Sequence, residues 1–550
     1  MPTVSARIAE VLAHYVDHVF GVMGNGNAYL LDALERDQAA TFTAVRNEAG
    51  AVVAADAHYR SGGGLAAATT TYGPGFSNTL TSLAESALAR IPLVLITGDA
   101  PTSGSRPWDV DQTCLAAAVG VETFTVGAQN AGTLTAEAIQ YAVWHRMPVV
   151  LAIPYDLAAT PVTEEAVAHQ EPAPAPLPVT DTEALAQVSE KLRTASGPLL
   201  LAGRGAHLSG AGPVLAELAE ATGALTATTA LARGLFQQDE RDLGVAGGFG
   251  AEGAMETVRE ADLVIVVGAS LNQFTMRFGD LFAPETTVVQ IDTAEEPTNP
   301  RVNLFLRGDA TRAAGELLTT VRASGATAAG SGWQDVDTMA LRRYEPGEEF
   351  AGDGRLDPRA LARAIGELLP EERVVVSDGG HFIAWANMYW PVTAPERMVM
   401  VGTAYQAIGQ GFPSVAGAVA AHPGETVVLT TGDGGGLMAL ADLETAVRTA
   451  GGHGMAVVWN DAAYGAEVNL YGLKGLAPGP MHIRETDFAA LASALGAQGV
   501  VVRSHADLEH LRRWRETPAA ERPFLLLDCR ISTEVIAPYQ EEVIRMNSGR

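Results

Sequence analysis

Basic residues and cysteines are scarce in this chain. Its 550 residues include 36 lysines and arginines against 64 aspartates and glutamates, which gives a formal net charge of −28. Such an excess of acid disfavours nucleic acid and anionic membranes as partners. Cys114 and Cys529 are the only cysteines, too few for a disulfide scaffold and in keeping with a reducing compartment.

Long apolar runs are also missing. The chain has no uninterrupted stretch of about 18 apolar residues and no charged-then-apolar leader, so we expect a cytoplasmic protein without a membrane segment. With 47% hydrophobic residues over 550 positions, the chain is too long for one core. It predicts roughly three domains.

Apolar strand patterns alternate with helical patterns in three blocks, 1–160, 181–322 and 355–540. This alternation predicts an α/β fold of three doubly wound parallel-sheet domains. A proline-rich segment, 170–178, and a small-residue segment, 323–332, are expected to be linkers. The first and third blocks are alike in length and class, although the sequence does not show that they are duplicates.

The third block contains an aspartate and an asparagine that follow neighbouring strands. One apolar strand pattern leads into Gly432-Asp433-Gly434-Gly435, and a second leads into Asn460, 27 positions beyond Asp433. That spacing fits one strand–helix–strand unit, which places both side chains at the carboxyl ends of neighbouring parallel strands. Their oxygens suit Mg²⁺ shared with phosphates, and the glycines allow a diphosphate to approach a helix N-terminus.

Two further segments strengthen this pattern. Glu48 lies in Val-Arg-Asn-Glu-Ala-Gly-Ala, residues 45–51, and Ile408 lies in Ala-Tyr-Gln-Ala-Ile-Gly-Gln-Gly-Phe-Pro, residues 404–413. Together with the glycine-rich turn they resemble the thiamine diphosphate enzymes of the acetolactate synthase, pyruvate oxidase and benzoylformate decarboxylase family. The resemblance covers nearly the whole chain. It implies a pyrimidine-binding, a central and a diphosphate-binding domain, in that order.

The resemblance implies thiamine diphosphate and Mg²⁺ as cofactors, with Asp433, Asn460 and the backbone carbonyl of Ala462 as metal ligands. The family often has Asn-Asn where this chain has Asn460-Asp461, a departure at a position that is not the main ligand. Without the resemblance, Asp433 could simply cap the next helix and Asn460 could form an ordinary turn.

The resemblance also assigns the groups that would activate the cofactor. Glu48 would hydrogen-bond a pyrimidine nitrogen and so assist removal of the proton from the thiazolium C2. Ile408 would wedge between the two cofactor rings, and the carbonyl of Gln406 would accept from the amino group. The alternatives are a surface helix-capping glutamate and a plain core isoleucine.

Three loops and His381 would complete the site; each loop could equally be an ordinary turn, and His381 could be a packed or solvent-facing histidine. The family places its substrate and cofactor contacts at positions that correspond here to Asn25, Gly26 and Asn27 in the first loop, Thr71 and Asn78 in the second, Gln112 in the third, and His381 beside the diphosphate, with Gly432, Gly434 and Gly435 around it.

The expected reaction is decarboxylation of a pyruvate-like 2-oxo acid, followed by ligation to an aldehyde or ketone. Several simple decarboxylases carry a pocket histidine around positions 71–73, and this chain has none there, which favours carboligation. Leu470 replaces the tryptophan of anabolic acetolactate synthases. Glu467 replaces an apolar residue and, if it faces the pocket, disfavours an anionic acceptor.

Other interpretations stay open. The nearest is a non-oxidative decarboxylase that releases an aldehyde; a non-catalytic homologue and a dinucleotide-dependent dehydrogenase rank behind it. FAD is possible but unassigned, because segment 275–280 only faintly resembles a flavin contact. Since the family builds each site from two subunits, a homodimer or homotetramer is expected.

Overall fold

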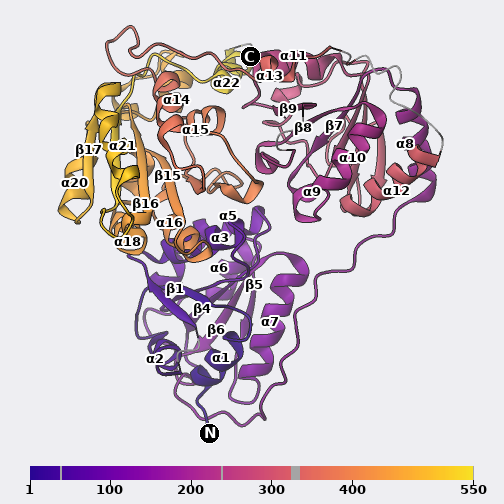
Figure 1. Ribbon diagram of the computed structural model, residues 1–550. Helices are drawn as coiled ribbons and strands as arrows, with labels where there is room; N and C mark the ends of the chain where they lie inside the picture. The colour runs from indigo at the N-terminus through magenta and orange to yellow at the C-terminus, as the bar shows by residue number, and fades with distance from the viewer. Residues whose placement is uncertain (38–39, 237–239, 324–332, 334, 549–550) are drawn as a thin grey trace.

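In a computed structural model of the chain, residues 1–37, 40–236, 240–323, 333 and 335–548 are described. They form three domains, each built on a six-stranded sheet in which all strand pairs are parallel. Figure 1 shows the first domain at the bottom, with the third and central domains above it. The predicted fold class, three doubly wound α/β domains, is confirmed.

The first domain has the strand order β2-β1-β3-β4-β6-β5. Its strands are β1 (His18–Gly21), β2 (Thr41–Ala44), β3 (Ala67–Thr70), β4 (Leu93–Asp99), β5 (Glu122–Thr125) and β6 (Pro148–Pro154). Its helices are α1 (Val4–Leu12), α2 (Ala28–Asp37), α3 (Glu48–Arg60), α4 (Pro74–Ser77), α5 (Leu80–Leu88), α6 (Gln112–Ala118) and α7 (Ala131–His145). Strands β4 and β6 are apolar and buried along nearly their whole length, because helices cover both faces of the sheet.

The third domain repeats this topology with the order β14-β13-β15-β16-β18-β17. Its strands are β13 (Arg373–Ser377), β14 (Met398–Met400), β15 (Thr426–Gly432), β16 (Gly454–Asn460), β17 (Gln498–Val502) and β18 (Leu525–Arg530). Its helices are α14 (Pro358–Leu368), α15 (Ile383–Tyr389), α16 (Gly411–Ala421), α17 (Asp433–Met438), α18 (Leu443–Ala450), α19 (Gly465–Glu467), α20 (Phe488–Ala494), α21 (Glu509–Glu516) and α22 (Pro538–Ser548). The shared strand order is a likeness that the sequence did not reveal.

The central domain is wound differently, with the order β12-β11-β10-β7-β8-β9. Its strands are β7 (Pro198–Ala202), β8 (Leu225–Thr228), β9 (Asp242–Val245), β10 (Leu263–Val267), β11 (Thr287–Asp292) and β12 (Leu304–Arg307). Its helices are α8 (Thr182–Thr194), α9 (Arg204–Leu208), α10 (Gly212–Thr222), α11 (Glu252–Glu260), α12 (Ala310–Ala323) and α13 (Thr338–Leu341). The expected proline-rich linker, 170–178, has no helix or strand, whereas the linker 323–332 lies outside the described residues apart from Ala323.

The first and third domains pack through α3 and α16, which run side by side in the same direction. Near the start of both helices, a Cβ on Gly50 would lie 3.1 Å from Cβ of Pro413; further along, a Cβ on Gly417 would clash with the carbonyl of Ala54. Glycines therefore let the two helices approach closely. As a result, the N-termini of α3 and α16 meet at the same end of the interface.

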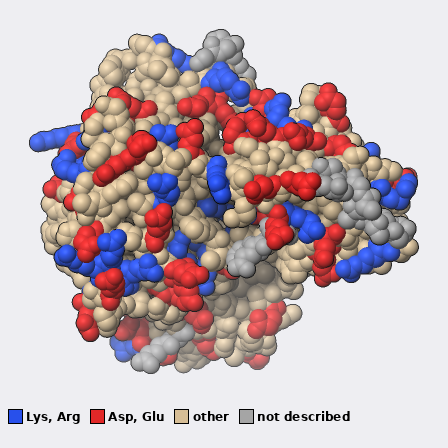
Figure 2. All heavy atoms as spheres, turned by 45° about the horizontal axis from the view of Figure 1, so that its top comes forward, with Lys and Arg blue, Asp and Glu red and all other residues tan. Residues whose placement is uncertain are grey.

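Charge is spread widely over the surface. On the face drawn in Figure 2, acidic and basic side chains are interspersed. None of the helices in the described ranges is long and apolar enough to cross a membrane.

Candidate active site

In the sheet of the third domain the strand order reverses between β13 and β15, because β14 is added on one side of β13 and the later strands on the other. Ligands of open α/β sheets bind at such a switch point, outside the carboxyl ends of the strands. Gly432 ends β15 and Asp433 begins α17. The glycines that follow are needed for close packing, since a Cβ on Gly434 would lie 2.9 Å from the ring of Tyr464. A Cβ on Gly435 would lie 2.7 Å from a carboxylate oxygen of Asp378.

Each of the two expected side-chain metal ligands has one buried oxygen without a hydrogen-bond partner within the described part of the chain. Asp433 is 3% exposed and its Oδ1 accepts from the N–H of Gly434, but its Oδ2 is unpaired. Asn460 is fully buried, and its amide nitrogen donates to the carbonyl of Thr486 and to Asp528, while its Oδ1 is unpaired. A buried oxygen without a hydrogen bond destabilises the folded protein, so two such oxygens at the ends of neighbouring strands indicate a site at which a ligand would bind.

Ala462 has a left-handed backbone, with φ of 60°, which is rare outside glycine. Together with Asp433 and Asn460 it offers one carboxylate, one amide and one carbonyl oxygen, the kinds of ligand that Mg²⁺ takes. In the described ranges no group of three or more His, Cys, Asp or Glu side chains could hold a metal ion. A site made of these three oxygens needs no such group, because only Asp433 contributes a side chain of those four types.

His381 lies beside this edge and pairs with Asp461, with 2.9 Å between Nε2 and Oδ2. Burial lowers the pKa of His381, but the negative charges of Asp461, Asp433 and Glu467 outweigh burial and raise it. Burial, with repulsion from Asp461, raises the pKa of Asp433 to about 7. The aspartate that replaces the family's second asparagine is thus the partner of His381.

The segment beyond the metal edge carries the expected substrate residues. Glu467 ends α19 and is exposed, while Leu470 is half-buried in the π-helical turn Val468–Gly472. A Cβ on Gly465 would collide with the ring of His381, so this segment packs directly over that histidine. Turns of the π type occur frequently at functional sites.

Gln406 and Ile408 lie in a tight turn at the same edge. Gln406 has a left-handed backbone, with φ of 61°, and Ile408 is 37% exposed. A Cβ on Gly379, which follows β13, would lie 3.5 Å from Cγ2 of Ile408. Ile408 therefore lies beside the point between β13 and β15 where the strand order reverses. Glu85, on α5 of the first domain, accepts from the N–H of Tyr405 at 2.6 Å. Ile408 is therefore not a core residue.

Asp378 holds this turn against the sheet. Its carboxylate is fully buried and accepts from the N–H groups of Gly409 at 3.2 Å and Gln410 at 3.1 Å, and from the hydroxyl of Thr431 at 3.0 Å. Burial raises the pKa of Asp378. Sequence reasoning assigned no role to Asp378 or Glu85. A lone acid after an apolar strand, or within an otherwise small and apolar helix, was the available signal.

Glu48 is the first residue of α3 and is half-buried. Its Oε2 accepts from the side-chain amide of Asn78 at 3.0 Å. Two residues before it, the N–H of Arg46 donates to Asp442 of the third domain at 2.8 Å. The segment around Glu48 is thus fixed against the third domain within a single chain.

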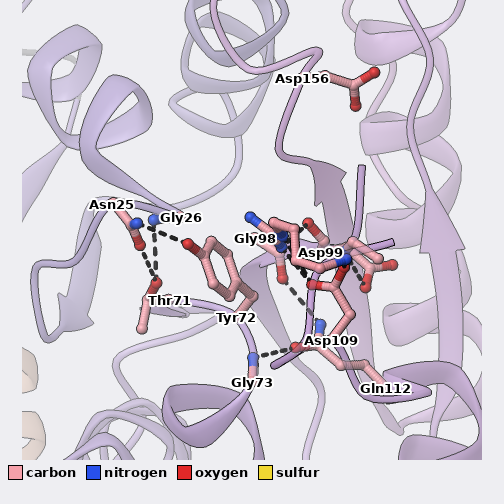
Figure 3. A network of polar contacts seen from close by, with 12 residues as sticks. Asn25, Gly26, Thr71, Tyr72, Gly73, Gly98, Asp99, Asp109, Gln112 and Asp156 are labelled. Atoms are coloured by element: carbon pink, nitrogen blue, oxygen red, sulfur yellow. Dashed lines mark hydrogen bonds and ion pairs between the residues drawn. The ribbon is translucent and has the colours of Figure 1, made fainter. Parts of the chain in front are cut away.

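The first two expected substrate loops are joined by side-chain hydrogen bonds (Figure 3). Asn25 donates to the hydroxyl of Tyr72 at 2.7 Å and accepts from the hydroxyl of Thr71 at 3.1 Å. The N–H of Gly26 donates to the same Thr71 oxygen, also at 3.1 Å. The strand order of the first sheet also reverses between β1 and β3. The loops that follow these two strands are therefore joined to each other by hydrogen bonds.

Gln112 and Asn27 brace these loops from within. Gln112 is 3% exposed; it accepts from the N–H of Gly73 at 2.6 Å and donates to the carbonyl of Gly98 at 2.9 Å, as Figure 3 shows. Asn27 is 1% exposed; its amide oxygen accepts from the N–H of Gly24, and its amide nitrogen donates to the carbonyl of Val22 and to the hydroxyl of Thr69 on β3. A direct substrate contact by either side chain stays a prediction.

In the central domain, the turn Gly203-Arg204-Gly205 after β7 packs against the backbone that follows β10. The N–H of Gly205 donates to the carbonyl of Gly268 at 2.8 Å, and a Cβ on Gly203 would clash with that carbonyl. Arg277, in the segment that faintly resembles a flavin contact, pairs with Glu252 and with Glu542 of α22. These contacts join β7 to β10 and the central domain to the C-terminal helix.

Comparison with known proteins gives three family matches along the chain. They are described as the N-terminal TPP binding domain, the central domain and the C-terminal TPP binding domain of thiamine pyrophosphate enzymes, and match residues 2–143, 185–317 and 378–526. An acetolactate synthase of Arthrospira platensis is 27% identical over 96% of this chain and 94% of its own length. The large subunit of acetolactate synthase isozyme 2 of Escherichia coli (strain K12) is 29% identical over 79% of each chain.

Proposed function

This chain belongs to the thiamine pyrophosphate enzymes and is an enzyme of their decarboxylase and carboligase type, and on that basis we propose that it decarboxylates a pyruvate-like 2-oxo acid and ligates the product to an acceptor carbonyl. Domains 1–160, 181–322 and 355–540 would be the pyrimidine-binding, central and diphosphate-binding domains. A cytoplasmic location belongs to the same proposal.

The observation that carries the proposal is the pair of unpaired buried oxygens, Asp433 Oδ2 and Asn460 Oδ1, beside the glycine turn. With the carbonyl of Ala462 they would hold Mg²⁺, and the backbone of Gly434 and Gly435 would face the diphosphate of the cofactor. Bound thiamine diphosphate would supply a carbon nucleophile and a store for the electron pair left when CO₂ departs.

The residues of this chain would prepare that chemistry. Glu48 would hold a proton at the pyrimidine ring nitrogen, and Asn78, which donates to its carboxylate, would orient it. Ile408, exposed at the edge of its turn, would support the bent shape of the cofactor. His381, paired with Asp461, would donate to a diphosphate oxygen.

Carboligation is favoured over simple decarboxylation by the residues around positions 71–73, which include no histidine. Glu467 is exposed on the segment over His381, where its charge would disfavour an anionic acceptor. A neutral aldehyde or ketone is therefore the proposed acceptor. FAD stays possible but unassigned.

Incubation with pyruvate and a panel of aldehydes, followed by mass spectrometry, tests the proposal. We expect CO₂ release and a 2-hydroxyketone whose mass follows the aldehyde supplied. An aldehyde as the sole product, whatever acceptor is offered, would support the alternative, a non-oxidative decarboxylase. No consumption of any 2-oxo acid would refute both.

The proposed oligomer is a homodimer or homotetramer in which Glu48 of one subunit serves the metal edge of another. Co-expression of Glu48→Gln and Asp433→Ala chains, each inactive alone, tests it. Random pairing would restore about a quarter of the wild-type activity, because half the dimers would contain one intact site. The absence of any activity would instead favour a site completed within one chain, where α3 already packs against α16.

A further inference from the structure

Tyr72 is a polar residue that the proposed mechanism does not use, although it lies in segment 71–73, around which several simple decarboxylases of the family carry a histidine. It follows β3, and only 9% of its surface is exposed. Its hydroxyl oxygen lies 2.7 Å from the side-chain nitrogen of Asn25. Figure 3 shows the ring of Tyr72 between the first loop and the network around Gln112.

The hydrogen bonds around Asn25 fix the direction of the Tyr72 hydroxyl. The N–H of Gly26 donates to Oγ1 of Thr71, which leaves the proton of that hydroxyl for Oδ1 of Asn25. The amide nitrogen of Asn25 therefore faces Tyr72 and donates to it. The oxygen of Tyr72 is thus an acceptor in this network, so its own proton points elsewhere.

That proton has no acceptor among the described residues, since the bond from Asn25 is the one hydrogen bond found for the Tyr72 hydroxyl. Asn25 itself is exposed, and so is the neighbouring Met23. The hydrogen-bonded end of Tyr72 therefore lies at the open side of the loops rather than in the core. A donor in this position is available to a bound molecule.

The ring of Tyr72 is held in place by Arg106. The guanidinium carbon of Arg106 lies 4.1 Å from the centroid of the Tyr72 ring and 4.8 Å from that of Tyr155. Asp109 binds the same guanidinium through two nitrogens, at 2.6 and 2.9 Å. Cation–π contact and a two-point ion pair fix the ring, so its hydroxyl is ordered before a ligand binds.

The hydroxyl also lies near the expected reaction centre. A Cβ on Gly75 would lie 2.6 Å from the methyl group of Thr71 and 3.5 Å from a carboxylate oxygen of Glu48. Thr71 is in turn bonded to Asn25, the partner of Tyr72. Glu48 and Thr71 therefore both lie close to Gly75, and hydrogen bonds lead from Thr71 through Asn25 to the Tyr72 hydroxyl.

We propose that Tyr72 is a specificity-determining residue whose hydroxyl donates a hydrogen bond to the 2-oxo oxygen of the substrate, with Asn25 as the residue that orients it. This inference rests on the proposed function. A neutral donor suits an oxygen on which negative charge develops when the carbonyl carbon is attacked. The proton remains on Tyr72, so the residue positions and polarises the substrate without a proton transfer.

Replacement of Tyr72 by phenylalanine tests the assignment, because it removes the hydroxyl and keeps the ring beneath Arg106. We expect kcat for pyruvate to fall roughly 10- to 100-fold with a smaller change in KM, since the bond strengthens as charge develops. Affinity for acetylphosphonate, a pyruvate analogue that cannot lose CO₂, should also fall, while thiamine diphosphate affinity and Tm stay unchanged. Tyr141→Phe, on α7 against Phe124 and His145, is the matched control.

A second variant, Asn25→Ala, removes the partner of the Tyr72 hydroxyl; in this proposal Asn25 acts through Tyr72 rather than by the direct substrate contact that the resemblance implies. Its loss of kcat should be smaller than that of Tyr72→Phe, and the double variant should be no worse than Tyr72→Phe alone. Unchanged kcat and acetylphosphonate affinity in Tyr72→Phe, or fully additive losses, would overturn the assignment and leave the proposed function intact. A wild-type protein that neither releases CO₂ nor binds acetylphosphonate would overturn both.

Discussion

Replacing Glu48, the first residue of α3, by glutamine should affect catalytic activity much more than the stability of the fold. Glu48 is half-buried and its carboxylate accepts from Asn78 at 3.0 Å. Glutamine keeps an oxygen that can accept this bond, so the loss in stability is limited to the helix-dipole term, at most about 1 kcal/mol. Loss of a positioned acid–base group costs about 10²- to 10⁴-fold in rate, or roughly 3 to 5 kcal/mol of transition-state free energy.

The two readouts of this variant are therefore expected to diverge. The Tm should fall by a few degrees at most, while CO₂ release from pyruvate, and exchange of the thiazolium C2 proton followed by NMR, should fall by at least two orders of magnitude. Glu183→Gln, an exposed acid in the first turn of α8, is the control for the helix-end charge. Normal turnover and normal proton exchange in Glu48→Gln would remove Glu48 from the mechanism.

Three further outcomes are expected. Asp433→Ala should abolish Mg²⁺-dependent retention of thiamine diphosphate on gel filtration, because the one carboxylate among the three proposed metal ligands is lost; normal retention would refute the metal site. Ile408→Ala should lower turnover roughly 10- to 100-fold at unchanged cofactor affinity, and unaltered kinetics would contradict its role. Burial lowers the pKa of His58 to about 4 from 6.5, so stability should decline by about 3 kcal/mol as pH falls from 6.5 towards 4, since the folded state resists protonation. Thermal unfolding of His58→Gln should show a correspondingly weaker dependence of Tm on pH. The same dependence in variant and wild type would show that His58 is not the group responsible.

Much of the fold followed from the sequence because hydrophobic periodicity reports directly on buried parallel strands. The same physics explains why Asp433 and Asn460 could be placed together from their spacing: β15 and β16 are neighbours, with Gly432 opposite Trp459. One strand–helix–strand unit leaves little choice of geometry. The shared strand order of the first and third domains stayed hidden, because topology is fixed by long-range pairing rather than by local pattern.

The direction in which each loop side chain points could not be predicted from the sequence. Gln112 and Asn27 were expected to contact substrate; both are buried and hydrogen-bond within the protein, to Gly73 and to Thr69 respectively, and a substrate contact by either stays a prediction. Tyr72, next to the predicted Thr71, is the residue for which we propose a substrate contact in these loops. A loop sequence gives the residue types available but not which of them faces inward, since that depends on hydrogen bonds between segments distant in the chain.

Asp378 and Glu85 illustrate the same limit at the cofactor edge. Each holds the turn that carries Ile408, one from the sheet and one from the other domain. Within the turn itself their partners are backbone N–H groups, which every residue type except proline provides, so the sequence of the turn does not reveal these contacts. Only the apolar surroundings of the two acids distinguished them beforehand.

A crystal structure of the protein grown with thiamine diphosphate and Mg²⁺ tests the central claim most directly. We predict a metal ion about 2.0–2.1 Å from Oδ2 of Asp433, Oδ1 of Asn460 and the carbonyl of Ala462, with the diphosphate over the glycine turn and a pyrimidine nitrogen within hydrogen-bond distance of a Glu48 carboxylate. An ion bound elsewhere, or a cofactor whose pyrimidine ring lies beyond the reach of every Glu48 in the assembly, would contradict the account.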